Sequence, residues 1–200
     1  MSSQFYHTHA QDYFNQTIEV DPSSFLLPLV KYLTPGSKIL DIGCGSGRDM
    51  LWLTERGFHC TGLERSPELA ALARQHSTQP VIVADFESFD FSRMNMDAVL
   101  LIGALVHIPH ERFPEILSRI LKAIKPGGHA LITMKQGQGG QEADDGRMFF
   151  LWDKEDLLSI LKKMGLICLD FSVQTSQVRK SDTWMSLVLK EPSILESSDP

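Results

Sequence analysis

The chain has 200 residues, of which 42% are hydrophobic and 22% are charged, and this is enough for one compact domain with a sizeable core. Its formal net charge of -6 disfavours general nucleic-acid binding, because proteins of that kind need a basic surface to displace counterions from phosphates. No apolar run approaches the roughly 20 residues that cross a bilayer, and the first residues lack the basic and apolar regions of a signal peptide, so we expect a cytoplasmic protein without a membrane segment.

Short apolar runs rich in β-branched residues alternate with segments of helical period, which is typical of a mostly parallel sheet covered by helices on both faces. In chain order, the predicted elements begin with a helix from Asp21 to the stop at 34–36, a strand at 37–43, a helix at 48–56, a strand at 58–64 and a helix at 66–76. Strands at 80–85 and 96–103, a helix at 113–124 and a strand at 129–135 follow. The chain then continues with a helix at 153–164 and strands at 165–173 and 183–190. The last two strands have no helix between them and should be antiparallel. The pattern therefore predicts one α/β domain with seven strands.

The strongest functional signal is the segment ILDIGCGSGRD, in which a strand runs into a glycine-rich turn and then a helix. Gly43, Gly45 and Gly47 let the backbone turn tightly and let a ligand approach the N–H groups that begin the helix. The dinucleotide fingerprint G-x-G-x-x-G would need a glycine where Arg48 stands, and this disfavours a nicotinamide oxidoreductase.

Two carboxylates follow at the ends of the next two predicted strands. Glu64 lies 17 residues beyond Gly47, where a carboxylate can accept both hydroxyls of a ribose. Asp85 is followed by Phe86, so that a carboxylate could bind an adenine amino group while an aromatic ring borders the base. The alternatives are a solvated strand end for Glu64 and a turn cap for Asp85. Because parallel strands end at one edge of a sheet, the glycines and carboxylates together predict a nucleoside-binding crevice.

From about residue 10 to residue 190 the sequence resembles the class I S-adenosylmethionine-dependent methyltransferases. DIGCGSG is similar to their first motif, GLERS to the second, ADFES to the third, DAVLLIGALVHIP to the fourth and LKAIKPGGHALIT to the next. The resemblance implies a three-layer, Rossmann-like α/β fold with a seven-stranded, mostly parallel sheet of order 3-2-1-4-5-7-6, whose last strand is antiparallel. It also implies S-adenosyl-L-methionine as the cofactor.

The same resemblance implies which residues bind that cofactor. They are Asp41, Gly43 and Gly45 beside the methionine end, Cys44, Gly47 and Arg48 in the same turn, Glu64 at the ribose, Arg65, Asp85 and Phe86 around the adenine, and Ile102 and Gly103 beside the methionine and the sulfonium. For Asp41 a second role stays open, in which it orients the backbone of the turn and does not touch the ligand.

Within this class, the combination of GCGSGRD, LVHIP, a glycine-rich segment ending in GRMFF and a late R-x(4)-W resembles a group of small bacterial methyltransferases. The opening residues HAQDYFNQT also resemble that group, in which the first segment closes over the cofactor. This implies a lid at residues 1–20 that carries Tyr6 and Tyr13, a methyltransferase domain at residues 21–190, and a disordered tail at residues 191–200.

Three further residues are candidates on the acceptor side. His107 follows the fourth strand closely and is predicted to act as a general base, the alternative being a structural histidine at the start of a helix. The polar segment from Gln136 to Trp152 is predicted to cover the substrate. Its Arg147 either binds a substrate carboxylate or phosphate or pairs with neighbouring acids. Arg179 lies near the loop between the last two strands and is the third candidate.

No metal site is expected. The HIPHE segment lacks the H-E-x-x-H spacing of a zinc helix, and Cys44, Cys60 and Cys168 have neither zinc nor disulfide spacing.

The predicted reaction is methyl transfer to an oxygen, nitrogen, sulfur or carbon nucleophile, with most of the catalysis supplied by alignment of the reactants and removal of water. A small-molecule acceptor is expected, because the sequence shows neither a second domain nor a basic face. The alternatives are a methyltransferase that acts on RNA or protein, and a catalytically silent regulator that binds the cofactor. The protein is expected to be a monomer or a homodimer.

Overall fold

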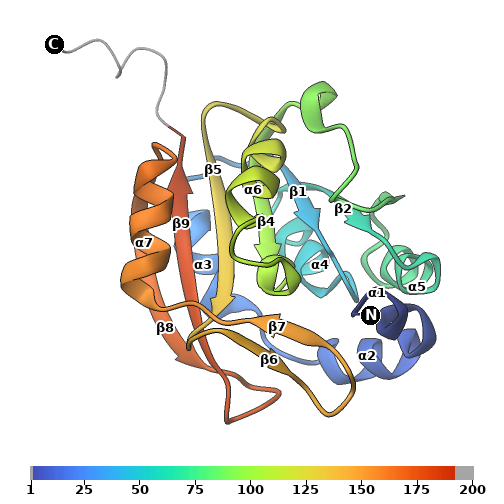
Figure 1. The fold of residues 1–200 in the computed structure, drawn as a ribbon. Helices are drawn as coiled ribbons and strands as arrows, with labels where there is room; N and C mark the ends of the chain where they lie inside the picture. Colours follow the sequence, from blue (N-terminus) through green and yellow to red (C-terminus); the bar gives the residue numbers. More distant parts are fainter. Residues whose placement is uncertain (1, 192–200) are drawn as a thin grey trace, which may run out of the picture.

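The computed structural model describes residues 2–191, in which a seven-stranded sheet lies between two layers of helices (Figure 1). The strands are β1 (Lys38–Ile42), β2 (His59–Glu64), β3 (Val81–Val83), β4 (Met96–Ile102), β5 (Ile124–Lys135), β8 (Ile167–Thr175) and β9 (Thr183–Lys190). They follow the order β3-β2-β1-β4-β5-β9-β8, with β1 to β5 parallel and β9 antiparallel to both of its neighbours. The predicted fold and strand order are confirmed, with β8 and β9 as the sixth and seventh strands.

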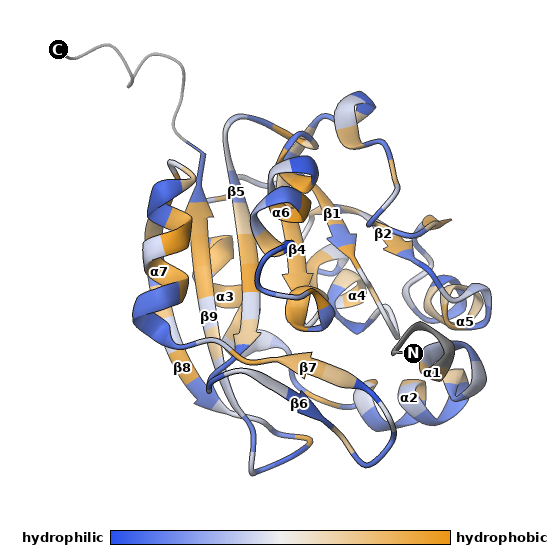
Figure 2. Cartoon of the chain, in the orientation of Figure 1, coloured by the Kyte–Doolittle hydropathy of each residue, from blue (hydrophilic) through white to orange (hydrophobic). Residues whose placement is uncertain are grey.

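Helices cover both faces of the sheet. On one face lie α3 (Ser23–Val30), α4 (Arg48–Thr54) and α5 (Pro67–Ser77), and on the other lie α6 (Phe113–Leu121) and α7 (Lys154–Lys163) (Figure 1). Alternate strand residues enter the two cores: Leu40 packs with α6, whereas Ile39 packs with α3 and α4. Side chains alternate between the faces of a strand, so a strand covered on both sides is apolar throughout, as the orange central strands of Figure 2 show.

Two helices begin where the sequence predicted them, because a side chain caps the first turn of each. The Ser66 hydroxyl accepts from Leu69 N at 3.2 Å at the start of α5, and Asp153 accepts from Glu155 N and Asp156 N at the start of α7. The first predicted helix is shorter than expected, because Asp21 accepts from Ser23 N at 2.9 Å and α3 begins only at Ser23. The strand predicted at 129–135 is longer, since β5 already begins at Ile124.

Two parts of the chain contain elements that the sequence did not predict. The N-terminal segment forms α1 (Ser2–Thr8) and α2 (Ala10–Thr17), and the polar segment after β5 contains the hairpin of β6 (Gly140–Glu142) and β7 (Met148–Phe150). Both lie at the edge of the sheet where β1, β4 and β5 end (Figure 1). The predicted lid and the predicted covering segment therefore have regular structure at the ligand edge.

Within residues 2–191, no helix is long and apolar enough to span a membrane. Most of the predicted tail, residues 192–200, lies outside the described residues.

Candidate active site

The glycine-rich turn lies across the ends of β1 and β2. Gly43 N and Cys44 N both donate to the Leu63 carbonyl, at 2.7 and 3.2 Å. Gly47 has a φ of +77°, and a Cβ there would lie 2.9 Å from the carbonyl oxygen of Ala73 in α5. Only glycine satisfies both the backbone conformation and the close packing of the turn against α5.

Glu64 is a buried carboxylate attached to this turn. Its Oε2 accepts from Gly45 N at 3.2 Å and its Oε1 accepts from Ser66 N at 2.9 Å, with 7% of the residue exposed. Burial raises its pKa above the usual range, and the amide hydrogen bonds and Arg65 oppose that rise. The backbone therefore fixes the position of both carboxylate oxygens.

Asp41, at the end of β1, is a second buried carboxylate. The residue is 2% exposed, and its Oδ2 has no hydrogen-bond partner within the part of the chain that the structure describes. Burial, Asp49 and Glu64 raise its pKa well above the usual range, in that order of size with Arg48 opposing. A buried acceptor without a hydrogen-bond partner costs free energy. A donor group on a positively charged ligand would supply the missing partner of Asp41 Oδ2.

Asp85 and Phe86 lie in the turn after β3. Asp85 Oδ1 accepts from Glu87 N at 2.9 Å and Oδ2 pairs with Arg65 Nη1 at 3.0 Å. The side chain of Asp85 therefore caps its turn, which was the alternative for this residue, while Phe86 and Arg65 line a cavity beside Glu64.

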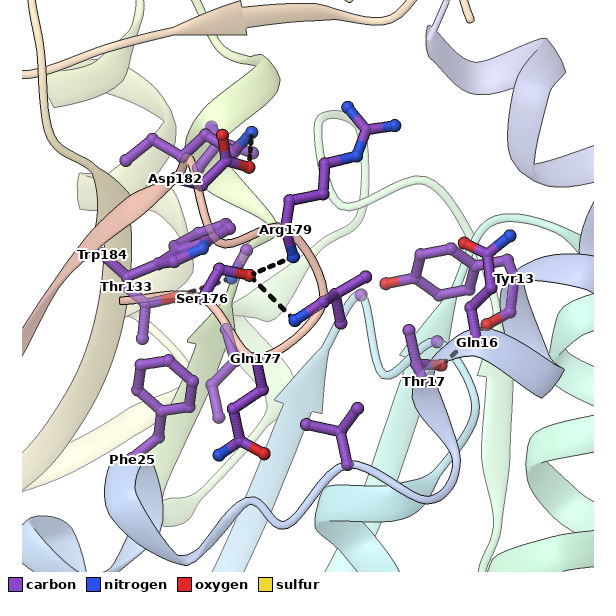
Figure 3. Close-up of a pocket in the computed structure, with 18 of the residues that line it drawn as sticks. Tyr13, Gln16, Thr17, Phe25, Thr133, Ser176, Gln177, Arg179, Asp182 and Trp184 are labelled. Atoms are coloured by element: carbon purple, nitrogen blue, oxygen red, sulfur yellow. Dashed lines mark hydrogen bonds and ion pairs between the residues drawn. The ribbon is translucent and has the colours of Figure 1, made fainter. Parts of the chain in front are cut away.

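Two cavities meet at the ends of β1 and β4. The Glu64 cavity is lined by Leu63, Glu64, Arg65, Ser66, Leu69, Phe86, Glu87, Ala104, His107 and Ile108. The Trp184 cavity, of about 190 Å³, is lined on one side by Tyr13, Gln16 and Thr17 and on the other by Thr133, Ser176, Asp182 and Trp184, with Arg179 between them (Figure 3). Six residues line both cavities: Tyr6, Tyr13, Gly43, Gly45, Ile102 and Gly103.

His107, at the end of the short 3-10 helix η2 (Leu105–His107), contacts Tyr6 in this shared wall. Its Nδ1 lies 2.6 Å from the Met148 carbonyl oxygen, which can only accept, so Nδ1 carries the proton. Its Nε2 therefore accepts from the Tyr6 hydroxyl at 3.0 Å. Burial, aided by the positive charges of Arg147 and Lys135, lowers the pKa of His107 to about 4. The imidazole is therefore neutral at neutral pH, with a pKa well below the ordinary histidine value of about 6.5.

Arg147 connects the hairpin to the N-terminal helix. Its Nε and Nη2 pair with the two oxygens of Asp145 at 3.0 and 2.7 Å, while its Nη1 donates to the Tyr6 hydroxyl oxygen at 3.2 Å. Arg179 contacts the same Asp145 carboxylate at 3.2 Å. Of the two roles that the sequence left open for Arg147, the structure shows the pairing with a neighbouring acid.

Lys135, at the end of β5, lines the Trp184 cavity and was missed by the sequence reasoning. Its ammonium lies 2.7 Å from Asp182 Oδ2 and 3.8 Å from the centre of the Phe149 ring. Its position in the sequence could have indicated this role. Lys135 is a single charged residue at the carboxyl end of an apolar strand, and the carboxyl ends of parallel strands form the usual ligand crevice.

In the part of the chain that the structure describes, no group of three or more His, Cys, Asp or Glu residues could hold a metal ion. His110 Nε2 instead donates to the Leu151 carbonyl at 2.8 Å.

Residues 39–128 match the family model described as a methyltransferase domain. In this sequence match and in its fold, the chain is similar to the class I S-adenosylmethionine-dependent methyltransferases. The chain is 29% identical over 178 residues to phosphoethanolamine N-methyltransferase 2 of Caenorhabditis elegans, a match that covers 82% of the chain and 39% of the relative. The matches cover 39%, 36% and 32% of the length of the first three curated relatives.

Solved structures of methyltransferases share the fold. The Burkholderia thailandensis 1,6-didemethyltoxoflavin-N1-methyltransferase, with bound 1,6-didemethyltoxoflavin and S-adenosylhomocysteine, matches with a TM-score of 0.74 at 18% identity over 95% of this chain and 85% of that chain. Magnesium protoporphyrin IX methyltransferase from Synechocystis PCC 6803, with bound S-adenosylmethionine, matches with a TM-score of 0.74 at 15% identity over 94% of both chains.

Proposed function

We propose that the protein transfers a methyl group from S-adenosylmethionine to a small-molecule acceptor. The observation that carries this proposal is the meeting of two cavities at Gly43, Gly45 and Gly103, with a backbone-held carboxylate, Glu64, in one of them. A donor and an acceptor of the methyl group need two such compartments with a common boundary.

The Glu64 cavity and the shared wall fit the cofactor. Glu64 would hold the ribose, and Asp41, whose buried Oδ2 has no hydrogen-bond partner among residues 2–191, would serve the positively charged methionine end. The remaining cofactor residues are those that the family resemblance implied: Gly43, Cys44, Gly45, Gly47, Arg48, Arg65, Asp85, Phe86, Ile102 and Gly103. When bound, the cofactor supplies a methyl group on a positively charged sulfur.

Cys44 and Arg48 line one side of the Trp184 cavity, and the rest of this cavity then belongs to the acceptor. Its total volume of about 190 Å³ suits a small molecule. The named activity of the Caenorhabditis elegans relative, an N-methyltransferase of phosphoethanolamine, also supports an acceptor of this size. Residues 21–190 would form the methyltransferase domain, and residues 1–20 would form a lid over the shared wall.

We further propose that His107 receives the acceptor's proton by way of Tyr6. As an acceptor O–H or N–H group gains the methyl group, its proton passes to the Tyr6 hydroxyl oxygen, and the Tyr6 hydroxyl proton passes to Nε2 of His107. A tyrosine hydroxyl can accept two hydrogen bonds while it donates one, so Arg147 can stay bound during the transfer. The product state is an imidazolium whose Nδ1–H still donates to the Met148 carbonyl.

Calorimetry tests the cofactor assignment. We expect the purified protein to bind S-adenosylmethionine and S-adenosylhomocysteine but not NAD, because Arg48 replaces the third glycine of the dinucleotide fingerprint. Tight NAD binding without adenosylmethionine binding would refute the assignment. Release of S-adenosylhomocysteine from a metabolite extract with labelled cofactor would then separate an active enzyme from a silent cofactor-binding regulator.

Hydrogen exchange tests the lid. Backbone amides of α1, α2 and the β6–β7 hairpin should exchange more slowly when S-adenosylhomocysteine is added, because Tyr6 and Tyr13 line both cavities and Arg147 ties the hairpin to Tyr6. Amides of α7, which covers the sheet away from the cavities, serve as the internal control. Equal protection with and without ligand in α1 and α2 would remove them from the site.

A further inference from the structure

Lys135 and Gly103 lie near each other in the wall of the Trp184 cavity. Ile102 of β4 pairs with Thr133 of β5, and the Thr133 hydroxyl accepts from Gly103 N at 2.8 Å. Lys135 lies two residues farther along β5, which is about 7 Å at the usual rise of a strand. A group bound at Lys135 and an atom beside Gly103 can therefore belong to the same small molecule.

The Lys135 ammonium is buried inside this cavity with few oxygen partners. Its side chain is 8% exposed, and its ammonium lies 3.8 Å from the centre of the Phe149 ring and 5.7 Å from that of Trp184. Within residues 2–191 its one carboxylate partner is Asp182. An ammonium has three N–H donors, and ring faces attract its charge without offering the lone pair of an oxygen. The ammonium can therefore bind a further anionic oxygen.

The charges around Lys135 favour an anion. Three cations, Lys135, Arg147 and Arg179, share two carboxylates, Asp145 and Asp182, because Asp145 pairs with both arginines. The remaining ion pair of the cavity wall, Arg48 with Asp49, is balanced. This side of the cavity therefore carries one positive charge more than its own acids neutralise.

Asp182 is placed so that it can give up its position beside Lys135. It ends the connection between β8 and β9, in which the Ser176 hydroxyl accepts from Val178 N and Arg179 N (Figure 3), and its side chain is 21% exposed. Within the described residues, no hydrogen bond or ion pair joins its second carboxylate oxygen to the sheet. Rotation of this one side chain would free the ammonium without moving β9.

We propose, on the basis of the proposed methyl transfer, that the acceptor carries an anionic oxygen group, a carboxylate or a phosphate, which Lys135 binds in place of Asp182. Asp182 neutralises the ammonium only while the acceptor is absent. The methyl-accepting atom of such a molecule lies on the Gly103 side of the cavity, and its anionic group lies at Lys135.

Binding of simple anions to the protein saturated with S-adenosylhomocysteine tests this proposal. The probes are benzoate, phenyl phosphate and the neutral benzamide, followed by tryptophan fluorescence, since Trp184 lies beside the ammonium. We expect the wild type to bind at least one anion and not benzamide, and Lys135→Gln to weaken that anion by about tenfold or more, as when a charge-assisted hydrogen bond is lost. Lys163→Gln, on the exposed side of α7, is the matched control and should bind like the wild type.

Asp182→Asn is expected to change the affinity for the anion in the opposite direction to Lys135→Gln. If Asp182 competes with the acceptor's anion, this variant should bind the anion several-fold more tightly, whereas a purely structural ion pair would make binding weaker or leave it unchanged. The proposal is overturned if no anion binds, if benzamide binds as well as the anions, or if Lys135→Gln binds them like the wild type. Calorimetry with S-adenosylhomocysteine on each variant distinguishes these results from failure of the cofactor site, and the two anions distinguish carboxylate from phosphate recognition.

Discussion

Replacement of His107 by alanine is expected to lower kcat by about 10²-fold or more while changing the affinity for S-adenosylhomocysteine far less, although His107 also lines the Glu64 cavity. The substitution removes Nε2, the atom that accepts the Tyr6 hydroxyl hydrogen bond at 3.0 Å, and with it the final position of the acceptor's proton. Single-turnover rates with labelled cofactor, and with an acceptor found in the metabolite screen, measure the effect directly.

Three comparisons separate a base from a structural histidine. Tyr6→Phe keeps the ring in the shared wall but removes the hydroxyl, so it should slow the reaction as His107→Ala does, and the double variant should be little slower than either one because both act on one proton path. His59→Ala, on an exposed histidine at the start of β2, is the control. A loss of less than tenfold in the His107 variant would mean that alignment alone carries the reaction.

The pH dependence of the reaction rate follows from the burial of His107, which lowers its pKa. The reactive form is the neutral imidazole, whose folded-state pKa is lowered to about 4, so the rate should be constant through neutral pH and fall only as pH drops through about 4. An acid limb near the ordinary histidine value of about 6.5 would mean that another group, or an exposed His107, controls the reaction.

Glu64→Ala is expected to weaken S-adenosylhomocysteine binding by about 10–100-fold, which corresponds to the roughly 1–3 kcal/mol lost when buried hydrogen-bonding groups lose their acceptor. The substitution removes the proposed ribose acceptor, and it also leaves Gly45 N and Ser66 N without their partner. Calorimetry on the purified variant gives the dissociation constant.

Two further variants define the contribution of Glu64. Glu64→Gln keeps a carbonyl oxygen for one of the two amides, so it should lose less affinity than the alanine variant. Glu55→Ala, an exposed glutamate at the end of α4, should bind like the wild type. An affinity in Glu64→Ala equal to that of the wild type would place the ribose elsewhere.

The sequence predicted the sheet well because its signals are local. Strands such as Lys38–Ile42 and Met96–Ile102 are apolar runs bounded by glycine, and the turn between β1 and α4 needs glycines whose positive φ angles are set within a few residues. The family motifs then supplied the strand order, which no local pattern contains.

The parts that the sequence did not predict depend on contacts between distant residues. Tyr6 and His107 are 101 residues apart, and the pairing of Lys135 with Asp182 joins the end of β5 to the connection before β9. The N-terminal helices and the β6–β7 hairpin are short and polar, so packing against the sheet edge stabilises them more than their own propensity does. Arg147 is a local exception, since Asp145 lies only two residues away; the sequence offers several neighbouring acids, and only the fold selects Asp145 among them.

Tyr6 and Tyr13 form part of the wall of both cavities. A molecule in either cavity therefore contacts the same two rings, and the free energy of placing those rings is shared between the two ligands. Thermodynamic linkage then requires reciprocity: whatever factor the nucleoside ligand contributes to the affinity of the acceptor, the acceptor contributes to the affinity of the nucleoside ligand. Through this shared wall, an acceptor that holds the two rings in the position that the nucleoside ligand needs also raises the affinity of that ligand.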